Sequence, residues 1–274
     1  MLFWRLFKYD LLRGFQYNRF WYLVEVIMVS FITLFNGLWL KRAYPDVMFG
    51  WVDVLCLLLK GEKPIRELEI FRFPAMWMFI FALFVFLLLA YPGDGFSLHG
   101  IQVYLRSEKS GRWWLSKCLW MLVNTVLMWG LLWLTSYLVS CWMGMGEIGS
   151  LSTELRLQIL GLEENVQIFW LLMLLFVVPV VMTFSLGLLT LTLAVFVNAI
   201  TAYLLVVSYL FFGVLFAFSG FVGNYVMLLR YRALAESLDG FVLKGLMIGA
   251  LLAVCSAGIG YRQLGKRFFV RGDR

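Results

Sequence analysis

The densest group of charged side chains in this chain lies in YLRSEKSGRWWLSKCLW, residues 104–120. This segment contains four bases and one acid, which are Arg106, Glu108, Lys109, Arg112 and Lys117. Closely spaced charges of both signs are typical of a surface that docks another protein, because complementary charges set register and partner choice. The small residues Ser107, Ser110 and Gly111 favour a short helix and turn there. The alternative is that the bases only hold the chain's orientation in a membrane.

Enzyme chemistry has few candidate residues in this sequence. The only histidine is His99. The four cysteines, Cys56, Cys118, Cys141 and Cys255, form no CxxC pair. We therefore expect no catalytic residue, no metal site and no cofactor on this chain. The segment GYRQLGKR, residues 260–267, comes close to a phosphate loop, but Arg267 replaces the hydroxyl that holds Mg²⁺, and no strand precedes it.

The composition is that of a membrane protein. Hydrophobic residues make up 63% of the chain and charged residues 14%, with a mean hydropathy of +0.88. A soluble fold could not cover so much apolar surface with so few charges. Because a membrane crossing takes about 20 helical residues, we predict an all-α polytopic protein with six transmembrane helices. The predicted spans are about 20–40, 75–91, 116–143, 166–192, 199–220 and 241–261.

Charge distribution favours six passes with both termini cytoplasmic. Residues 165–229 contain no charged side chain over 65 positions, enough for two or three passes, and Asn198 is the best turn candidate between two. With six spans, one side collects both termini and the 92–115 loop, with thirteen bases and four acids. The other side has ten bases and eleven acids. A seventh pass would place the basic tail 262–274 outside, against the positive-inside bias.

The first 19 residues are expected to form an amphipathic helix in the cytoplasmic interface, before the chain turns into the first span. Arg5, Lys8, Gln16 and Arg19 share one arc of the helical wheel. Phe3, Trp4, Phe7, Leu11 and Phe15 lie on the opposite arc. Such a helix is attracted to anionic headgroups. The alternative is a frayed basic tail.

Two further groups of residues are expected to lie at or in the membrane. Trp113, Trp114 and Lys117 are predicted to anchor the third span at headgroup level, where amphipathic rings are favoured. Glu25 is the sole acid inside a predicted span, and intramembrane carboxylates are functional candidates. It either serves a substrate or coupling role, or pairs with Arg19 at the interface.

The sixth predicted span has a stripe of small residues. Gly245, Gly249 and Ala253 recur at intervals of four, which places them on one face of a helix. Small residues let a neighbouring helix approach closely, and in lipid this close packing is a main source of association energy. The stripe is either a contact within the chain or part of a subunit interface.

One pattern runs through the charged segment and consists of Tyr104, Leu105, Arg106, Ser107, Ser110, Arg112, Trp113, Trp114, Ser116 and Lys117. This pattern resembles a segment in permease subunits of bacterial ATP-binding-cassette (ABC) exporters of the type 2 class. As sequence, the resemblance covers only residues 104–117; the six-span layout is similar along nearly the whole chain. It implies that the 104–117 loop seats in a cytoplasmic ATPase subunit. The residues that would face this subunit are Arg106, Ser107, Glu108, Lys109, Ser110 and Arg112. The run Ser-Glu-Lys-Ser-Gly-Arg departs from the compact Ser-Arg pairing expected there.

The resemblance also implies the partners. ATP and Mg²⁺ would bind the separate ATPase, and a second permease copy or a homologous permease chain would complete the pathway in a bacterial plasma membrane. We expect the protein to contact membrane lipid and to bind no nucleic acid. Residues 212–229 would be a re-entrant element outside. A secondary transporter remains an alternative, although it predicts several buried carboxylates and an internal inverted repeat. An assembly or immunity protein is a further alternative.

Overall fold

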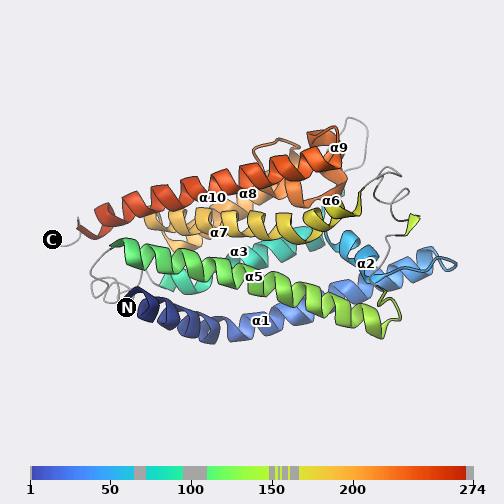
Figure 1. Cartoon of the computed structure of the whole chain (residues 1–274), viewed down its shortest axis with the longest axis horizontal. Coiled ribbons are helices and arrows are strands. Elements are labelled where there is room, and N and C mark those ends of the chain that lie inside the picture. The colour runs from blue at the N-terminus through green and yellow to red at the C-terminus, as the bar shows by residue number, and fades with distance from the viewer. Residues whose placement is uncertain are drawn as a thin grey trace.

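The computed structural model describes residues 2–64, 72–94, 110–147, 152, 153, 155, 160 and 167–269, and this part of the chain is helical without a strand. Long helices lie side by side along the molecule's long axis (Figure 1). They are α1 Leu2–Ala43, α3 Ala75–Asp94, α5 Ser110–Trp142, α7 Val178–Phe196, α8 Ala199–Leu215 and α10 Leu238–Phe269. Shorter elements are α2 Trp51–Leu58, α6 Ile168–Leu172, the π-helical turn η2 Met173–Val177, the 3₁₀ turns η3 Val222–Val226 and η4 Leu228–Arg230, and α9 Tyr231–Leu234.

Five helical segments in the described residues are long and apolar enough to cross a membrane. They are Phe3–Ala43, Ala75–Gly93, Gly111–Trp142, Ile168–Phe196 and Leu238–Leu264. The expected span 199–220 corresponds to α8, which is apolar but only 17 residues long. α8 begins at the predicted position because Asn198 caps it: its side chain accepts a hydrogen bond from the Thr201 N–H at 2.8 Å.

α8 ends earlier than predicted because the chain folds back on it. Phe216 is extended, and the Asn224 side-chain amide donates to the carbonyl oxygens of Phe216 and Phe218, both at 3.0 Å. The Tyr209 hydroxyl donates to the Gly220 carbonyl at 2.5 Å and accepts from the Val222 N–H at 3.0 Å. Through these contacts, the carbonyl groups of Phe216, Phe218 and Gly220 are hydrogen-bonded without continuing the helix.

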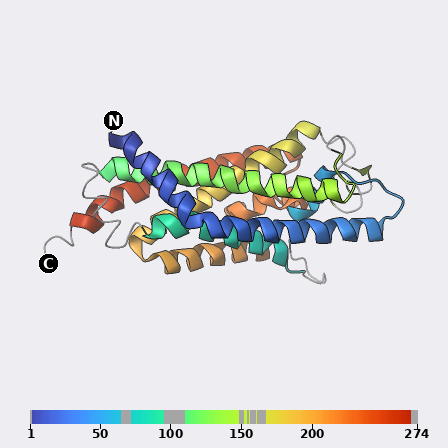
Figure 2. The same ribbon diagram turned by 90° about the horizontal axis from the view of Figure 1, so that it is seen from below.

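α1 is one helix from Leu2 to Ala43, with no break near residue 19, where a separate interfacial helix was expected to end. Figure 2 shows its N-terminal part inclined to the rest. Buried positions continue through both parts, including Asp10, Asn18 and Glu25. The Asn18 side chain donates to the Leu87 carbonyl of α3 at 2.9 Å. This N-terminal part therefore packs against the bundle.

The helices form two parallel pairs. In the first, Gly14 of α1 lies against Trp120 of α5, and Gly37 of α1 lies against Met143, the residue after the end of α5, so both helices run in the same direction. In the second, Gly249 of α10 lies against Met182 of α7. The Thr192 hydroxyl further along α7 donates to the Ser256 carbonyl of α10 at 2.7 Å.

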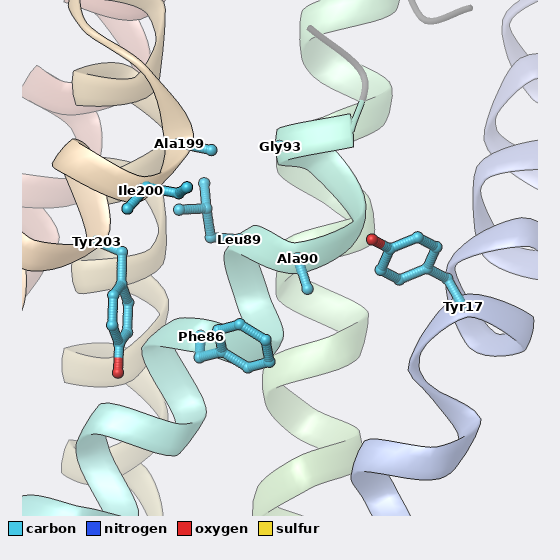
Figure 3. A pocket seen from close by; sticks show the side chains of 8 residues that line it. All are labelled: Tyr17, Phe86, Leu89, Ala90, Gly93, Ala199, Ile200 and Tyr203. Carbon is cyan, nitrogen blue, oxygen red and sulfur yellow. The ribbon is translucent and has the colours of Figure 1, made fainter. Parts of the chain in front are cut away.

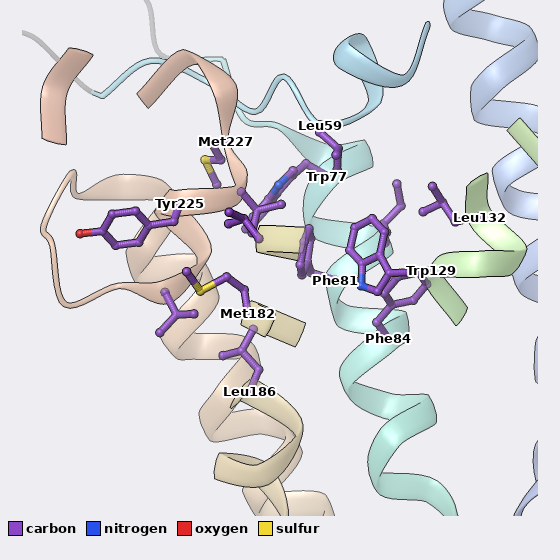
Figure 4. Close-up of a cluster of buried hydrophobic side chains, with 14 of the residues drawn as sticks. Leu59, Trp77, Phe81, Phe84, Trp129, Leu132, Met182, Leu186, Tyr225 and Met227 are labelled. Carbon is purple, nitrogen blue, oxygen red and sulfur yellow. The ribbon is translucent and has the colours of Figure 1, made fainter. Parts of the chain in front are cut away.

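Figures 1 and 2 place the first residues of α1 and α5 and the last residues of α10 at one end of the bundle, here called the terminal end. The opposite end, which contains α2, η3, η4 and α9, is the cap end. Between the ends lies a continuous core of aromatic and aliphatic side chains. Figure 4 shows part of it, contributed by Trp77, Phe81 and Phe84 of α3, Trp129 and Leu132 of α5, Met182 and Leu186 of α7, and Tyr225 and Met227 near the cap end.

Candidate functional site: a buried polar cluster at the start of α5

The charged segment 104–117 is described from Ser110 onward, where α5 begins. Arg106, Ser107, Glu108 and Lys109 lie outside the described residues. Their expected contact with an ATPase therefore stays a prediction. Arg112 lies in the first turn of α5 and is half-buried. The described part of the segment leads within two turns into a buried polar cluster.

This cluster surrounds Asp10 of α1. Lys117 Nζ lies 2.8 Å from Asp10 Oδ1, and the side chains are 4% and 0% exposed. The Tyr91 hydroxyl of α3 donates to the same oxygen at 2.7 Å, and the Ser116 hydroxyl donates to Oδ2 at 2.5 Å. A buried carboxylate is costly unless it is paired and hydrogen-bonded, and here both oxygens have partners. The cluster thus fastens the start of α5 to α1 and α3.

Aromatic rings enclose the cation of this ion pair. Lys117 Nζ lies 4.3 Å from the ring centroid of Tyr91 and 5.5 Å from that of Trp113, both within cation–π range. Tyr91 in turn packs against Trp120, with ring centroids 5.1 Å apart. Gly14 of α1 provides the space for the Trp120 indole, because any side chain there would overlap it. The cluster is therefore a tightly packed joint between three helices.

The tandem tryptophans point into the bundle. Trp113 and Trp114 are 0% and 4% exposed. Trp114 Nε1 donates to the Ala257 carbonyl of α10 at 2.9 Å, and its ring lies against Gly260, which has no Cβ to exclude it. The sequence led us to expect Trp113, Trp114 and Lys117 to anchor the third span at headgroup level, and their depth in a membrane stays a prediction. Within the chain they are buried between helices, because Gly260 leaves room for an indole and Asp10 offers the ammonium group a partner.

Glu25 is fully buried on α1, and neither of its carboxyl oxygens has a hydrogen-bond partner among the described residues. Arg19 is exposed, so the alternative of an interfacial Arg19–Glu25 pair does not hold. Tyr22, one turn before Glu25 on α1, donates its hydroxyl to Asn124 Oδ1 at 2.6 Å instead. An uncompensated carboxyl inside a transmembrane helix is a functional candidate by default.

The small residues of α10 make contacts within the chain. A Cβ added at Gly245 would meet the Tyr225 ring at 3.0 Å, and one at Gly249 would meet Met182 Sδ and Val181 Cγ1 at 3.0 Å. Ala253, four residues further, is 8% exposed. Of the two alternatives left open by the sequence, the described structure uses this stripe for packing against α7 and η3.

A buried arginine at the cap end was missed by the sequence reasoning. Arg230 is 0% exposed, and its guanidinium donates to the carbonyl oxygens of Glu62 at 2.9 Å and Gly213 at 3.0 Å. It also donates to Asn224 Oδ1 at 3.0 Å and to the Val214 carbonyl. Burial lowers the pKa of Arg230 to about 10, so the group is still a cation at neutral pH. The only sequence signal is that Arg230 directly follows the uncharged stretch 165–229.

Residues 212–229, which were expected to be re-entrant, divide between α8 and the cap end. Residues 222–231 are all buried. The N–H groups of Leu228 and Leu229 donate to the carbonyl oxygens of Leu59 and Lys60 at 3.2 and 3.1 Å. Arg230 therefore joins the end of α8 and the segment after α2 into one cap over this end of the bundle.

Among the described residues, no three His, Cys, Asp or Glu side chains gather as metal ligands would. The four cysteines are free thiols. The chemically distinctive groups are thus the Asp10 cluster, the isolated Glu25 carboxyl and the Arg230 cap. No protein-family model, curated protein or solved structure matches this chain.

Proposed function

We propose that this protein is the membrane-spanning permease subunit of an ABC exporter of the type 2 class, driven by a separate cytoplasmic ATPase. The observation that carries the proposal is the buried Asp10–Lys117 ion pair. The charged segment 104–117 runs directly into α5, and its last residue, Lys117, is locked to Asp10 of α1 and packed on Tyr91 of α3. A displacement of this segment by an ATPase would therefore move three helices together.

We propose six membrane passes, with α8 as the fifth and both termini in the cytoplasm of a bacterial cell. The 17 residues of α8 span about 25 Å at 1.5 Å per residue, close to the hydrocarbon thickness of about 30 Å. The two ends of the chain share the terminal end of the bundle (Figure 1), as an even number of passes requires. Arg5, Lys8 and Arg13 are exposed there, which fits a cytoplasmic, anionic leaflet.

On this topology the cap end faces outward. The cap is fastened by Arg230, whereas the charged segment 104–117, from here on called the coupling segment, leads into α5, which begins at the terminal end. Alternating access needs two packings of the helices whose relative stability the ATPase can bias. The parallel pairs α1–α5 and α7–α10 are the units that would move against each other, because each is packed through glycines along its length.

The proposal is tested by purifying the tagged full chain in a mild detergent and identifying what remains bound. A P-loop ATPase should accompany the wild-type protein and be lost with Arg106→Glu combined with Arg112→Glu. Arg42→Glu combined with Arg72→Glu reverses two exposed charges outside the coupling segment and is the matched control. No ATPase with any variant would refute the proposal, and equal recovery with both pairs would place docking elsewhere.

The topology is tested separately. A single cysteine at Lys109, in a chain without its native cysteines, should react only with a thiol reagent that enters cells. A reporter fused after Arg274 should be active only in the cytoplasm. Labelling of Lys109→Cys by an impermeant reagent would contradict the proposed orientation.

A secondary transporter is the second candidate, and the burial of Glu25 favours it. A carboxyl without a partner inside a transmembrane helix is where a coupling proton or cation would bind. This candidate needs no ATPase. Transport by a secondary transporter would survive Arg106→Glu combined with Arg112→Glu and would be lost with Glu25→Gln. Transport by the exporter would be lost when the two arginines are reversed.

A further inference from the structure

An apolar groove of about 410 Å³ runs along α3 between α1 and α8 (Figure 3). Its lining residues are Phe86, Leu89, Ala90 and Gly93 of α3, Tyr17 of α1, and Ala199, Ile200 and Tyr203 of α8. The α3 residues share one helix face, and the small side chains at Ala90 and Gly93 leave this face hollow. Volumes of 300–1,000 Å³ are typical of sites for small ligands.

Aromatic rings from all three helices pack together at the end of the groove nearer the middle of the bundle. Trp21 of α1 packs edge-on against Phe86 of α3, with ring centroids 4.8 Å apart. Phe86 packs in the same way against Tyr203 of α8 at 6.0 Å. At the other end, Gly93 and Ala199 lie together near the terminal end of the bundle. The groove is therefore apolar and lies between these aromatic rings and the terminal end of the bundle.

The mouth of the groove has positive character. Ala199 and Ile200 are the first two residues of α8, so their N–H groups precede the first intrahelical hydrogen bonds and carry the positive end of the helix dipole. Arg13 is exposed one turn before Tyr17, on the same face of α1. Tyr17 packs on Tyr91 of α3, with ring centroids 6.3 Å apart. The groove thus combines an apolar body with a cationic entrance.

We propose that this groove binds one acyl chain of an anionic phospholipid, with the phosphate at Arg13 and the first turn of α8. An acyl chain fits the shape and polarity of the body, and the headgroup charge complements the entrance. Bound lipid would join α1, α3 and α8 through one ligand. It would also contact Tyr17, which packs on Tyr91, a partner of Asp10 in the buried cluster. This site is independent of the transport class proposed above.

The first test uses the purified full chain, native mass spectrometry and two lipids with identical acyl chains, phosphatidylglycerol and phosphatidylcholine. The wild type should retain one phosphatidylglycerol. Ala90→Leu fills the groove and should weaken retention about tenfold, and Arg13→Gln should weaken it about fivefold. The matched controls Ala250→Leu and Arg262→Gln change exposed positions of α10 and should retain lipid like the wild type.

A second measurement needs no variant. Phosphatidylglycerol with a photoreactive group in its acyl chain should crosslink the wild-type protein within residues 86–93 and 199–203. The proposal is overturned if crosslinks fall elsewhere, if Ala90→Leu binds like the wild type, or if both lipids are retained equally. Crosslinks at the groove together with loss of lipid in Arg13→Gln would establish both halves of the site.

Discussion

The indole of Trp120 on α5 lies directly against the backbone of Gly14 on α1, in space that any larger residue at this position would occupy. The same helix pair is close again near the cap end, where Gly37 contacts Met143 and Lys41 Nζ donates to the Met143 carbonyl at 2.5 Å. α1 and α5 are therefore in register along most of their length. The Asp10–Lys117 pair lies one turn from the Gly14–Trp120 contact, so close packing and charge pairing act at one place.

Gly14→Ala should lower the thermal stability of the purified protein by several degrees, because the new methyl group overlaps Trp120. Gly130→Ala is the matched control, since a Cβ at Gly130 meets nothing within 4 Å. The control should be neutral or slightly stabilising, because alanine is the better helix former by about 1 kcal/mol. Equal midpoints for the two variants in a detergent melt would contradict the described contact.

Lys117→Met should destabilise the folded protein by about 3–5 kcal/mol, because it leaves the Asp10 carboxylate buried without its cation. Asp10→Asn alone should also destabilise it, by leaving the ammonium group buried. The double variant should be more stable than the sum of the two losses predicts, because no uncompensated charge remains. A double-mutant cycle of unfolding free energies measures this coupling, and additive losses would show that the pair does not form.

Glu25→Leu should leave thermal stability unchanged or raise it, because it replaces a buried carboxyl that has no described hydrogen-bond partner with an apolar side chain. Asp10→Leu is the comparison, since it removes a buried carboxylate whose oxygens are all engaged, and it should be strongly destabilising. The two midpoints are compared in one detergent. A large loss of stability in Glu25→Leu would mean that Glu25 has a structural partner.

Arg230→Lys should destabilise the cap end although the charge is retained. A lysine ammonium cannot reproduce the planar guanidinium that reaches Glu62, Gly213 and Asn224 together. Each lost charged hydrogen bond costs about 1.5–3 kcal/mol. Hydrogen exchange should increase in residues 216–234 and stay constant at the terminal end. Arg262→Lys, at an exposed position of α10 outside the cap end, should leave exchange in residues 216–234 unchanged.

The all-helical fold and the positions of most long apolar helices could be predicted from the sequence alone, because hydropathy and helix caps act locally. α3 starts at Ala75 and α8 at Ala199, as predicted, and the Asn198 cap explains the second of these. The end of α8 was placed five residues too late. Its termination depends on Asn224, which lies eight residues after Phe216 and reaches it only because the chain folds back.

The direction in which a side chain points was decided only by the tertiary structure. Their position at the start of the third span led us to expect Lys117 and the two tryptophans at headgroup level, since nothing within α5 reveals that Asp10 and Gly260 would meet them. Arg19, six residues before Glu25, was one expected partner, yet the fold turns Glu25 inward and leaves Arg19 outside. The periodicity of one helix shows which residues share a face of that helix. Which other helix this face packs against is decided by contacts between segments that lie far apart in the sequence, such as Asp10 and Lys117, more than 100 residues apart.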